Sequence, residues 1–590
     1  MTVNLTIDNQ PVTVPKGMTI LNAARSIGIK IPTLCHMEGV VSPGSCRVCL
    51  VEVEGARTLL PSCIAQVGEG MIVHVNSKTA RTARRTSVEL ILANHPLDCN
   101  NCSRNNNCEL QTIASDMGIT ASRFPRLVQE HPLDLSTSGL TRDMSKCILC
   151  RRCVTACQNI QQVGVLAAQK RGFATIIGGG AKANLAETTC VQCGQCAAVC
   201  PVGAITEKDA IADVWAALDD PKKHVVVHTA PAIRAALGEC FGMPAGSRVT
   251  GKMVTALRRL GFDKVFDTNF AADLTIMEEG FELIKRLTDA VRDKKDVALP
   301  QFTSCCPGWI NFAETFYPKS LPYLSSCKSP MQMEGPLIKT WYAQKAGIDP
   351  KDIVVVSVMP CTAKKHEANR PEMVDSGFKD TDYVLTTREL GKMVTAAGID
   401  FVNLPDGRAD ELAGESTGAA DIFANSGGVM EAALRTAYEV ITGRELPFPS
   451  LHVASIQGLD GIKEAAFKLD GCKPEFSFLE GVTVKVLVAH GLGNAHKVCK
   501  KLEAGDLAEY QFVEIMTCPG GCIGGGGQPR MTDDNVRRAR IAAIYSEDES
   551  RTLRKSHENP EIKRIYAEFL GEPLGHKSHH LLHTTYTPRQ

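Results

Sequence analysis

Residues 147–157 read CILCRRCVTAC, and residues 190–200 read CVQCGQCAAVC. Both stretches have the spacing C-x2-C-x2-C-x3-C, and together they form an internal repeat. Short loops of this kind wrap a 4Fe-4S cluster, and in two-cluster ferredoxins the fourth cysteine of each motif binds the other cluster. The repeat therefore predicts a bacterial-ferredoxin-like domain with two 4Fe-4S clusters over residues 138–209.

The crossed pattern gives each cluster four thiolates. We assign the first cluster to Cys147, Cys150, Cys153 and Cys200, and the second to Cys157, Cys190, Cys193 and Cys196. Pro201 follows the second motif as in ferredoxins, whereas Gln158 stands at the matching position of the first. Zinc is the alternative occupant, but zinc sites prefer paired C-x2-C knuckles.

Residues 1–80 combine strand patterns with a second cysteine group. Val3, Leu5 and Ile7 alternate with polar residues, and a turn and a second alternating run follow, which predicts a hairpin. We expect a helix over 20–27 and further strands near 50–53 and 71–75. The spacing C-x10-C-x2-C-x13-C suits a 2Fe-2S cluster, with zinc as the alternative, and its ligands are Cys35, Cys46, Cys49 and Cys63.

A third group lies in residues 81–125, which open with a helical pattern over 84–93 and lead into a predicted linker over 123–142. Its spacing is H-x3-C-x2-C-x5-C, formed by His95, Cys99, Cys102 and Cys108. Three cysteines leave one iron of a 4Fe-4S cluster without a ligand, so His95 is the candidate fourth ligand. The alternative interpretation is that His95 is an ordinary surface or core residue and binds no metal. A neutral imidazole in place of a thiolate should raise the cluster's potential.

The overall composition limits the possible classes of protein. A chain of 590 residues should hold several domains, and 24 cysteines in tight groups favour metal ligation over disulfides. Lys+Arg and Asp+Glu both number 65, so no net field would attract nucleic acid or an anionic membrane. The sequence shows no long apolar run, and it does not begin like a signal peptide. We therefore expect a cytoplasmic protein without a membrane span.

In residues 210–530, strand-like runs at 224–227, 353–358 and 482–488 alternate with amphipathic helical patterns, which predicts an α/β domain with parallel strands. Three motifs lie within it: TSCCPGW at 303–309, MPCTAKK at 359–365 and MTCPGGCIGGGGQP at 516–529. Together they resemble the signature motifs of the iron–iron (FeFe) hydrogenases. The resemblance covers essentially the whole chain.

The resemblance implies a multidomain α/β architecture. Its parts are an N-terminal β-grasp 2Fe-2S domain, a His/Cys 4Fe-4S domain, the two-cluster domain, and a large hydrogenase catalytic domain of two lobes. Residues 531–590 resemble the small subunit of two-chain relatives. The first two domains also resemble part of a respiratory complex I subunit.

The resemblance further implies an active-site H-cluster, which catalyses H2 ⇌ 2H+ + 2e−. Its 4Fe-4S part would be bound by Cys306, Cys361, Cys518 and Cys522, with Cys522 bridging to a diiron part that carries CO, cyanide and a dithiolate. Lys364 would donate to one cyanide, and the backbone at 230–231 is a candidate near the other. Met359, Met516 and Phe423 would pack around the irons, although ordinary core packing explains them equally well. At Ala232 and Ala363 relatives may carry hydroxyls.

A proton path is implied as well. The free thiol of Cys305 would receive the proton, and the path would continue through Glu279, Ser325 and Glu282, with Arg286 near the exit. Glu279 and Glu282 are spaced i,i+3 and so share one face of a predicted helix. The residues alone would equally suit a solvated acidic face.

Electron partners follow from what the chain lacks. The glycines at 524–527 and 178–180 are not in the strand–turn–helix context of a dinucleotide loop. We therefore expect flavin/NAD(P)-binding and 2Fe-2S partner subunits, or ferredoxin for a monomeric enzyme. The resemblance also implies hydrogenase maturases as partners. The rivals are a non-catalytic iron–sulfur assembly protein, an electron-transfer subunit related to complex I, and a sensory hydrogenase.

Some motifs have no assigned chemistry. Cys240, Cys327, Cys472 and Cys499 lack ligand spacing, so we interpret them as ordinary thiols. The terminal HKSHHLLH could bind a metal through His576, His579, His580 and His583, but a structural role is the favoured interpretation.

Overall fold

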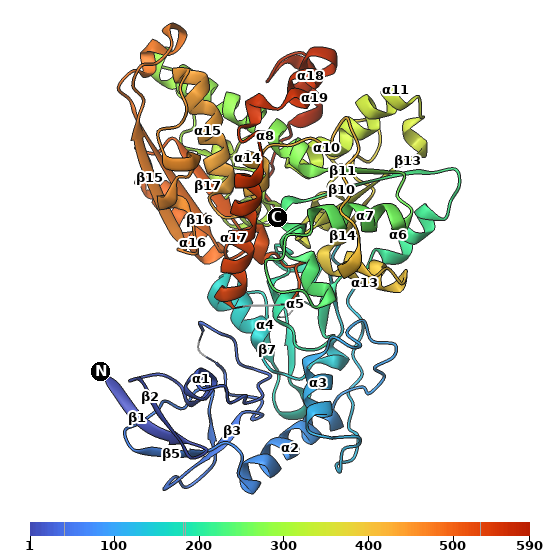
Figure 1. The fold of residues 1–590 in the computed structure, drawn as a ribbon, viewed down its shortest axis with the longest axis vertical. Coiled ribbons are helices and arrows are strands. Elements are labelled where there is room, and N and C mark those ends of the chain that lie inside the picture. Colours follow the sequence, from blue (N-terminus) through green and yellow to red (C-terminus); the bar gives the residue numbers. More distant parts are fainter. Residues whose placement is uncertain (41, 181, 183, 531–532, 590) are drawn as a thin grey trace.

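The computed structural model describes all residues except 41, 181, 183, 531, 532 and 590. In Figure 1 the N-terminal strands lie at the bottom of the long axis, and residues 210–530, the predicted catalytic region, lie at the top. The two-cluster region, drawn in cyan and teal, lies between them.

The N-terminal domain is built on a five-stranded sheet of order β2-β1-β5-β3-β4. Its strands are β1 (Thr2–Ile7), β2 (Gln10–Pro15), β3 (Leu50–Val53), β4 (Leu60–Pro61) and β5 (Met71–His74). Val3 pairs with Val14 in the antiparallel hairpin, which confirms the predicted alternation. Helix α1 (Ile20–Ser26) begins at Thr19, whose side chain accepts a hydrogen bond from the N–H of Asn22.

Two helices and two small sheets form the middle of the chain. Helix α2 (Lys78–Ala93) includes the predicted 84–93 stretch, and α3 (Glu109–Asp116) follows the third cysteine group. Two antiparallel pairs form the sheets: β6 (Leu140–Arg142) with β9 (Ile205–Glu207), and β7 (Ala167–Gln169) with β8 (Ile176–Gly178). The short helices α4 (Arg152–Thr155) and α5 (Gln195–Val199) each carry the third cysteine of a repeat.

The catalytic region contains two four-stranded sheets, of order β11-β10-β13-β14 and β12-β17-β16-β15. The first consists of β10 (His224–Thr229), β11 (Lys264–Asp267), β13 (Ile353–Met359) and β14 (Tyr383–Thr386), and all its pairings are parallel. The second consists of β12 (Gln301–Phe302), β15 (Ile462–Lys468), β16 (Thr483–His490) and β17 (Phe512–Met516). Only its edge strand β15 pairs antiparallel. The α/β prediction is confirmed, and each sheet forms one lobe.

Helices cover both sheets. They are α6 (Ile211–Leu218), α7 (Thr250–Leu260), α8 (Thr268–Leu287), α9 (Pro307–Phe316), α10 (Pro330–Leu337), α11 (Ala343–Ala346), α12 (Ala363–Glu367), α13 (Thr387–Ala396), α14 (Gly418–Asp421), α15 (Gly428–Thr442) and α16 (Leu492–Ala504). Helix α8 packs against both α10 and α15, and most of its residues are buried.

The C-terminal segment is helical, with α17 (Asp534–Ser550), α18 (Pro560–Ile565) and α19 (His576–Leu582). These helices, drawn in red in Figure 1, pack on the catalytic region: α17 on α14, α18 on α8 and α19 on α10. Among the described residues, every helix is too short or too polar to span a membrane.

Candidate active site

The three cysteine motifs of the catalytic region meet at the carboxyl ends of parallel strands. Cys305 and Cys306 follow β12, Cys361 follows β13, and Cys518 follows β17. In open α/β sheets this edge is where ligands bind. The motifs line one mainly apolar pocket between the two sheets, and Cys522 lines it too.

The four sulfurs in this pocket suit an iron–sulfur cluster. All 24 cysteines of the chain are free, and Cys306, Cys361, Cys518 and Cys522 lie close enough to perturb one another. Burial raises the pKa of Cys361 to about 12, and Cys306 contributes. The N–H of Thr517 points at Cys306 Sγ, 3.4 Å away, as backbone donors do at cluster thiolates. The donor set therefore fits a 4Fe-4S cluster.

The rest of the lining is largely apolar. Met359, Met516 and Phe423 line the pocket, as do Ala230 and Pro231. Thr268, Pro330 and Met331 also line it, and no sequence motif marked them. They come from the first turns of α8 and α10, and they reach the pocket only through the packing of these helices.

Lys364 supplies a fixed positive charge at the pocket. Its Nζ donates to Glu367 Oε2 at 2.8 Å and to the backbone oxygen of Cys305 at 3.3 Å. Burial disfavours its charged form, but Glu367 outweighs this effect and raises the pKa of Lys364. The ammonium group therefore stays protonated, as an anion-binding role requires.

A line of polar side chains leads away from Cys305. Burial raises the pKa of the Cys305 thiol well above its usual value, and nearby Glu279 adds to the shift. Burial, followed by the charge of Glu282, raises the pKa of Glu279 to about 8. Ser325 Oγ donates to Glu282 Oε2 at 2.7 Å, and Arg286 Nη2 donates to Glu282 Oε1 at 2.7 Å. Hydrogen bonds thus join Ser325, Glu282 and Arg286. Among the described residues, the buried carboxylate oxygens of Glu279 have no hydrogen-bond partner, and Glu279 is linked to Cys305 and Glu282 only through its electrostatic influence.

The accessory groups also converge within the fold. In the N-terminal domain Cys49 Sγ lies 3.4 Å from Cys63 Sγ, and hydrogen bonds from Cys46 and Cys63 lower the pKa of Cys35. In the third group His95 is buried, and its Nδ1 has no hydrogen-bond partner. Burial lowers the pKa of His95 to about 4, so the imidazole is neutral, as a metal ligand must be.

The two repeats share one backbone shape. The second residue after the first cysteine is left-handed in both, Leu149 at φ 54° and Gln192 at φ 56°. The residue after the second cysteine is also left-handed in both, Arg151 at φ 63° and Gly194 at φ 72°. Such left-handed residues turn successive N–H groups inward and form an anion-binding concavity. The loops are therefore shaped for a cluster.

The sulfurs of the repeats group in the crossed pattern. A single apolar pocket is lined by Cys157, Cys190, Cys193 and Cys196. Burial raises the pKa values of Cys147, Cys150 and Cys153, and the nearby Cys200 raises each further. Each repeat thus supplies its fourth cysteine to the neighbourhood of the other.

Fold and site together define a multi-cluster iron–sulfur redox enzyme. The family model described as iron only hydrogenase large subunit, C-terminal domain, matches residues 223–526, and the iron hydrogenase small subunit model matches residues 534–589. Upstream, a 2Fe-2S iron-sulfur cluster binding domain matches 1–78, the NADH-ubiquinone oxidoreductase-G iron-sulfur binding region matches 84–123, and a 4Fe-4S dicluster domain matches 146–204. The chain belongs to the iron-only (FeFe) hydrogenase family.

Individual relatives agree with this assignment. The chain is 49% identical to the NADP-reducing hydrogenase subunit HndD of Solidesulfovibrio fructosivorans, with 99% of each chain covered. It is 40% identical to iron hydrogenase 1 of Clostridium pasteurianum over 96% of this chain and 97% of that one. A solved structure of a variant of FeFe-hydrogenase HydA1 from Chlamydomonas reinhardtii aligns at a TM-score of 0.58 and 47% identity, covering 65% of this chain and 99% of that one.

Proposed function

We propose that this chain is the hydrogen-activating subunit of an assembly that exchanges electrons with NADP through partner subunits. The observation that carries the proposal is the convergence of four cysteines, Cys305 and Lys364 on one pocket. The relative HndD is named as a subunit of an NADP-reducing hydrogenase. Because the chain carries no dinucleotide-loop motif, a partner must bind the nucleotide.

When bound, the H-cluster supplies the metal chemistry that splits and forms hydrogen. Cys306, Cys361, Cys518 and Cys522 hold it, and the apolar side chains of the pocket exclude water. Lys364 presents a positive charge toward anionic groups of the cluster. Cys305 keeps its thiol proton, because burial holds the pKa of that thiol high, and so it can hand on one proton at a time.

Protons leave through Glu279, Ser325 and Glu282. With a pKa of about 8, Glu279 can both hold and release a proton near neutral pH. The Ser325 hydroxyl contacts Glu282, and Arg286 keeps Glu282 oriented at the outer end of the series.

Electrons take a separate path through the accessory clusters. Ser45, beside Cys46, donates to the backbone oxygen of Cys150 at 3.4 Å. A Cβ added at Gly203, close in sequence to Cys200, would lie 3.0 Å from Cys102 Sγ. Both N-terminal groups therefore border the cluster of Cys147, Cys150, Cys153 and Cys200. The other ferredoxin-like cluster borders the active site, so the path branches outward toward two exits.

The proposed metal cofactors of the chain are one 2Fe-2S cluster, three accessory 4Fe-4S clusters and the H-cluster. Maturases help to insert the H-cluster. A cytoplasmic location is part of the proposal. Direct transfer to ferredoxin is the second candidate, because the chain's own accessory clusters could serve a small carrier.

The test is expression with the maturation proteins, followed by hydrogen-dependent reduction of a viologen dye, of ferredoxin, and of NADP with and without candidate partner subunits. Dye reduction together with partner-dependent NADP reduction is expected. Rapid ferredoxin reduction without any NADP reduction would favour the second candidate. Loss of dye reduction in protein that shows CO and cyanide infrared bands would contradict hydrogen activation by this chain.

A further inference from the structure

Arg104 is a buried cation in the third cysteine group, between Cys102 and Cys108 in the sequence. The residue is only 3% exposed. Its Nη1 donates to the backbone oxygen of Cys200 at 3.1 Å, and its Nε donates to the backbone oxygen of Asn107. Its guanidinium group therefore joins the third cysteine group to the ferredoxin-like domain.

The ligand loops of two proposed clusters touch at this point. We name these clusters after one ligand each: the His95 cluster of the third group, and the Cys200 cluster, which Cys147, Cys150 and Cys153 complete. A Cβ added at Gly203 would lie 3.0 Å from Cys102 Sγ and 3.5 Å from Arg104 Cγ. The N–H of Glu109 donates to the backbone oxygen of Pro201 at 3.1 Å, so the residues that follow Cys108 and Cys200 are in direct contact. Arg104 thus lies between the two clusters.

The positive charge of Arg104 has no carboxylate beside it. Within the part of the chain that the structure describes, Arg104 forms no ion pair, and its hydrogen bonds go to uncharged backbone oxygens. Burial lowers the pKa of Arg104, and the negative charges of Cys200 and Cys108 oppose this fall more than that of Glu109. Because a buried charge without an opposite charge is costly, the anionic clusters are the expected partners.

Four other cations near the two clusters each contact a carboxylate, whereas Arg104 contacts backbone oxygens. These ion pairs are Arg152–Glu109 at 2.8 Å, Lys146–Asp143 at 2.9 Å, Arg388–Glu207 at 2.6 Å and Arg530–Glu207 at 3.3 Å.

We propose that Arg104 is the counter-charge of the His95 cluster and the Cys200 cluster and raises the reduction potentials of both. A 4Fe-4S cluster becomes more negative by one charge when it accepts an electron, so a nearby cation favours the reduced state. Net charge is one of the factors that set the potential of such a cluster. At an effective dielectric constant of about 20, one charge at roughly 10 Å changes an electron-binding equilibrium on the order of ten-fold.

A purely structural role explains Arg104 less completely. A neutral amide side chain could donate to the backbone oxygens of Cys200 and Asn107 without placing a charge inside the protein. Burial of a charge is far more costly than burial of a hydrogen-bonded neutral group. The guanidinium charge therefore needs a second explanation, and the adjacent clusters provide one.

The Cys200 cluster is the junction of the proposed electron path, because both N-terminal cluster groups border it. A raised potential at this junction draws electrons away from the active site. Arg104→Gln should therefore slow hydrogen oxidation more than hydrogen evolution. This consequence rests on the proposed function, whereas the shift in potential requires only that the two clusters are bound as assigned.

The test is an EPR-monitored redox titration of matured enzyme with all clusters loaded. Arg104→Gln removes the charge but keeps a hydrogen-bond donor, and Arg104→Lys keeps the charge. Glu109→Gln removes a negative charge from a partly exposed side chain at the same junction. The control is Arg123→Gln, which removes an exposed positive charge from the same domain. His95→Cys identifies the signal of the His95 cluster, because that substitution changes a ligand of this cluster alone.

Arg104→Gln should weaken electron binding by the His95 cluster and by one further 4Fe-4S cluster about ten-fold, a fall in potential of about 59 mV for a one-electron couple. Arg104→Lys should remain within about three-fold of the wild type, because the charge is kept. Glu109→Gln should shift the same two clusters upward, and Arg123→Gln should match the wild type. Unchanged potentials in Arg104→Gln, or equal falls in Arg104→Gln and Arg104→Lys, would overturn the proposal.

Two further measurements separate this inference from the proposed function. A wild type without a His95-dependent cluster signal would overturn the cluster assignment and the inference with it, whereas a full set of clusters with unshifted potentials would overturn the inference alone. If Arg104→Gln loses its clusters, Glu109→Gln decides the matter: an upward shift supports the proposal, and no shift overturns it. Retention of the CO and cyanide infrared bands in each variant shows that the active site remains assembled.

Discussion

Gly526 lies directly against the backbone of Cys193, so that a Cβ at Gly526 would be 2.4 Å from the Cys193 oxygen. Cys193 also lies close enough to add to the burial-driven rise in the pKa of Cys518. Gln195 Nε2 fixes the same contact by donating to the oxygen of Gly524 at 2.9 Å. The glycine-rich stretch thus lets a ferredoxin-like cluster loop approach the active site.

Gly526→Val should therefore separate the two cluster loops and slow electron transfer between them several-fold. Added bulk at a tight contact also costs about 1–3 kcal/mol of stability. The enzyme also catalyses isotope exchange between H2 gas and deuterated water, a reaction in which no electron leaves the active site. The rate of this exchange should fall less than the rate of dye reduction. Gly68→Ala is the control, because its added methyl meets only the flexible end of Met71. Equal losses of both activities would mean that the substitution damages the active site itself.

The ligand assignment predicts the iron content. One binuclear cluster, three four-iron clusters and a six-iron active site require about 20 irons in the matured protein. Iron analysis combined with EPR of the reduced enzyme measures this number. Detection of only two four-iron clusters in fully matured protein would contradict the branched electron path.

His95→Cys should keep its cluster and lower the cluster's reduction potential. The neutral imidazole would be replaced by an anionic thiolate, which stabilises the oxidised cluster. An EPR-monitored redox titration compares the variant with wild type, and His74→Cys, in strand β5, provides the control. A potential equal to that of wild type would show that His95 is not a ligand.

Glu279 should make stability depend on pH in a defined direction. Its pKa is raised from 4.5 to about 8 in the folded protein, so the folded chain holds this proton more tightly than the unfolded chain between those values. The free energy of unfolding therefore falls as pH rises through this window, by on the order of 4–5 kcal/mol at most. Glu279→Gln carries no titrating group.

The melting temperature of Glu279→Gln relative to wild type should thus rise from pH 4.5 to about 8 and then level off. Melting curves of the two proteins across this range provide the measurement. A difference that stays constant with pH would show that the carboxyl group has an ordinary pKa.

Much of the architecture could be predicted from local patterns. The alternation at Val3, Leu5 and Ile7 specified a hairpin, because one face of the strand is buried. The cysteine spacings identified the cluster loops, because a cluster accepts few loop lengths. Neither kind of signal depends on distant contacts.

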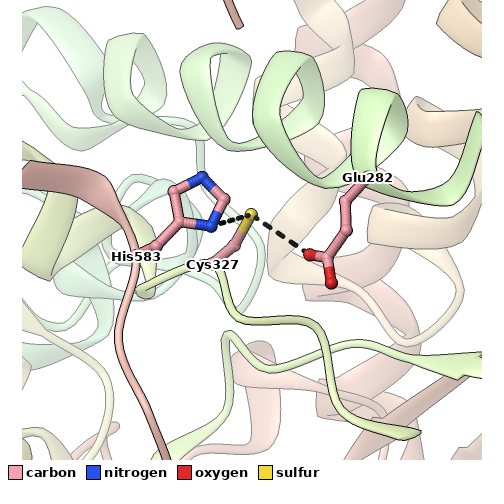
Figure 2. Close-up of side chains that lie close together, drawn as sticks. All are labelled: Glu282, Cys327 and His583. Atoms are coloured by element: carbon pink, nitrogen blue, oxygen red, sulfur yellow. Dashed lines mark hydrogen bonds between the residues drawn. The ribbon is translucent and has the colours of Figure 1, made fainter. Parts of the chain in front are cut away.

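Features made by distant segments could not be predicted. Cys327 and His583 are 256 residues apart, yet Cys327 Sγ lies 4.0 Å from His583 Nδ1 (Figure 2). Thr268 and Met331 reach the pocket only because α8 and α10 pack together. The approach of Gly526 to Cys193 likewise depends on how two domains dock.

Cys305→Ala should lower turnover about 10²–10⁴-fold, the usual contribution of a general acid–base group. Cys306 is committed to the cluster, so Cys305 is the thiol that faces Glu279 from the pocket. Cys305→Asp keeps a titratable group of similar reach and should retain more activity than Cys305→Ala. Cys499→Ala is the matched control, because it removes a buried thiol remote from the pocket.

Turnover and infrared spectra of these variants provide the test. The CO and cyanide bands should persist in both Cys305 variants, because no cluster ligand is removed. Turnover of Cys305→Ala at the wild-type rate would show that protons leave by another route. Loss of the bands would instead show that Cys305 is needed to assemble the site. Low turnover with intact bands, partly restored by aspartate, is the combination that only a proton-carrying Cys305 explains.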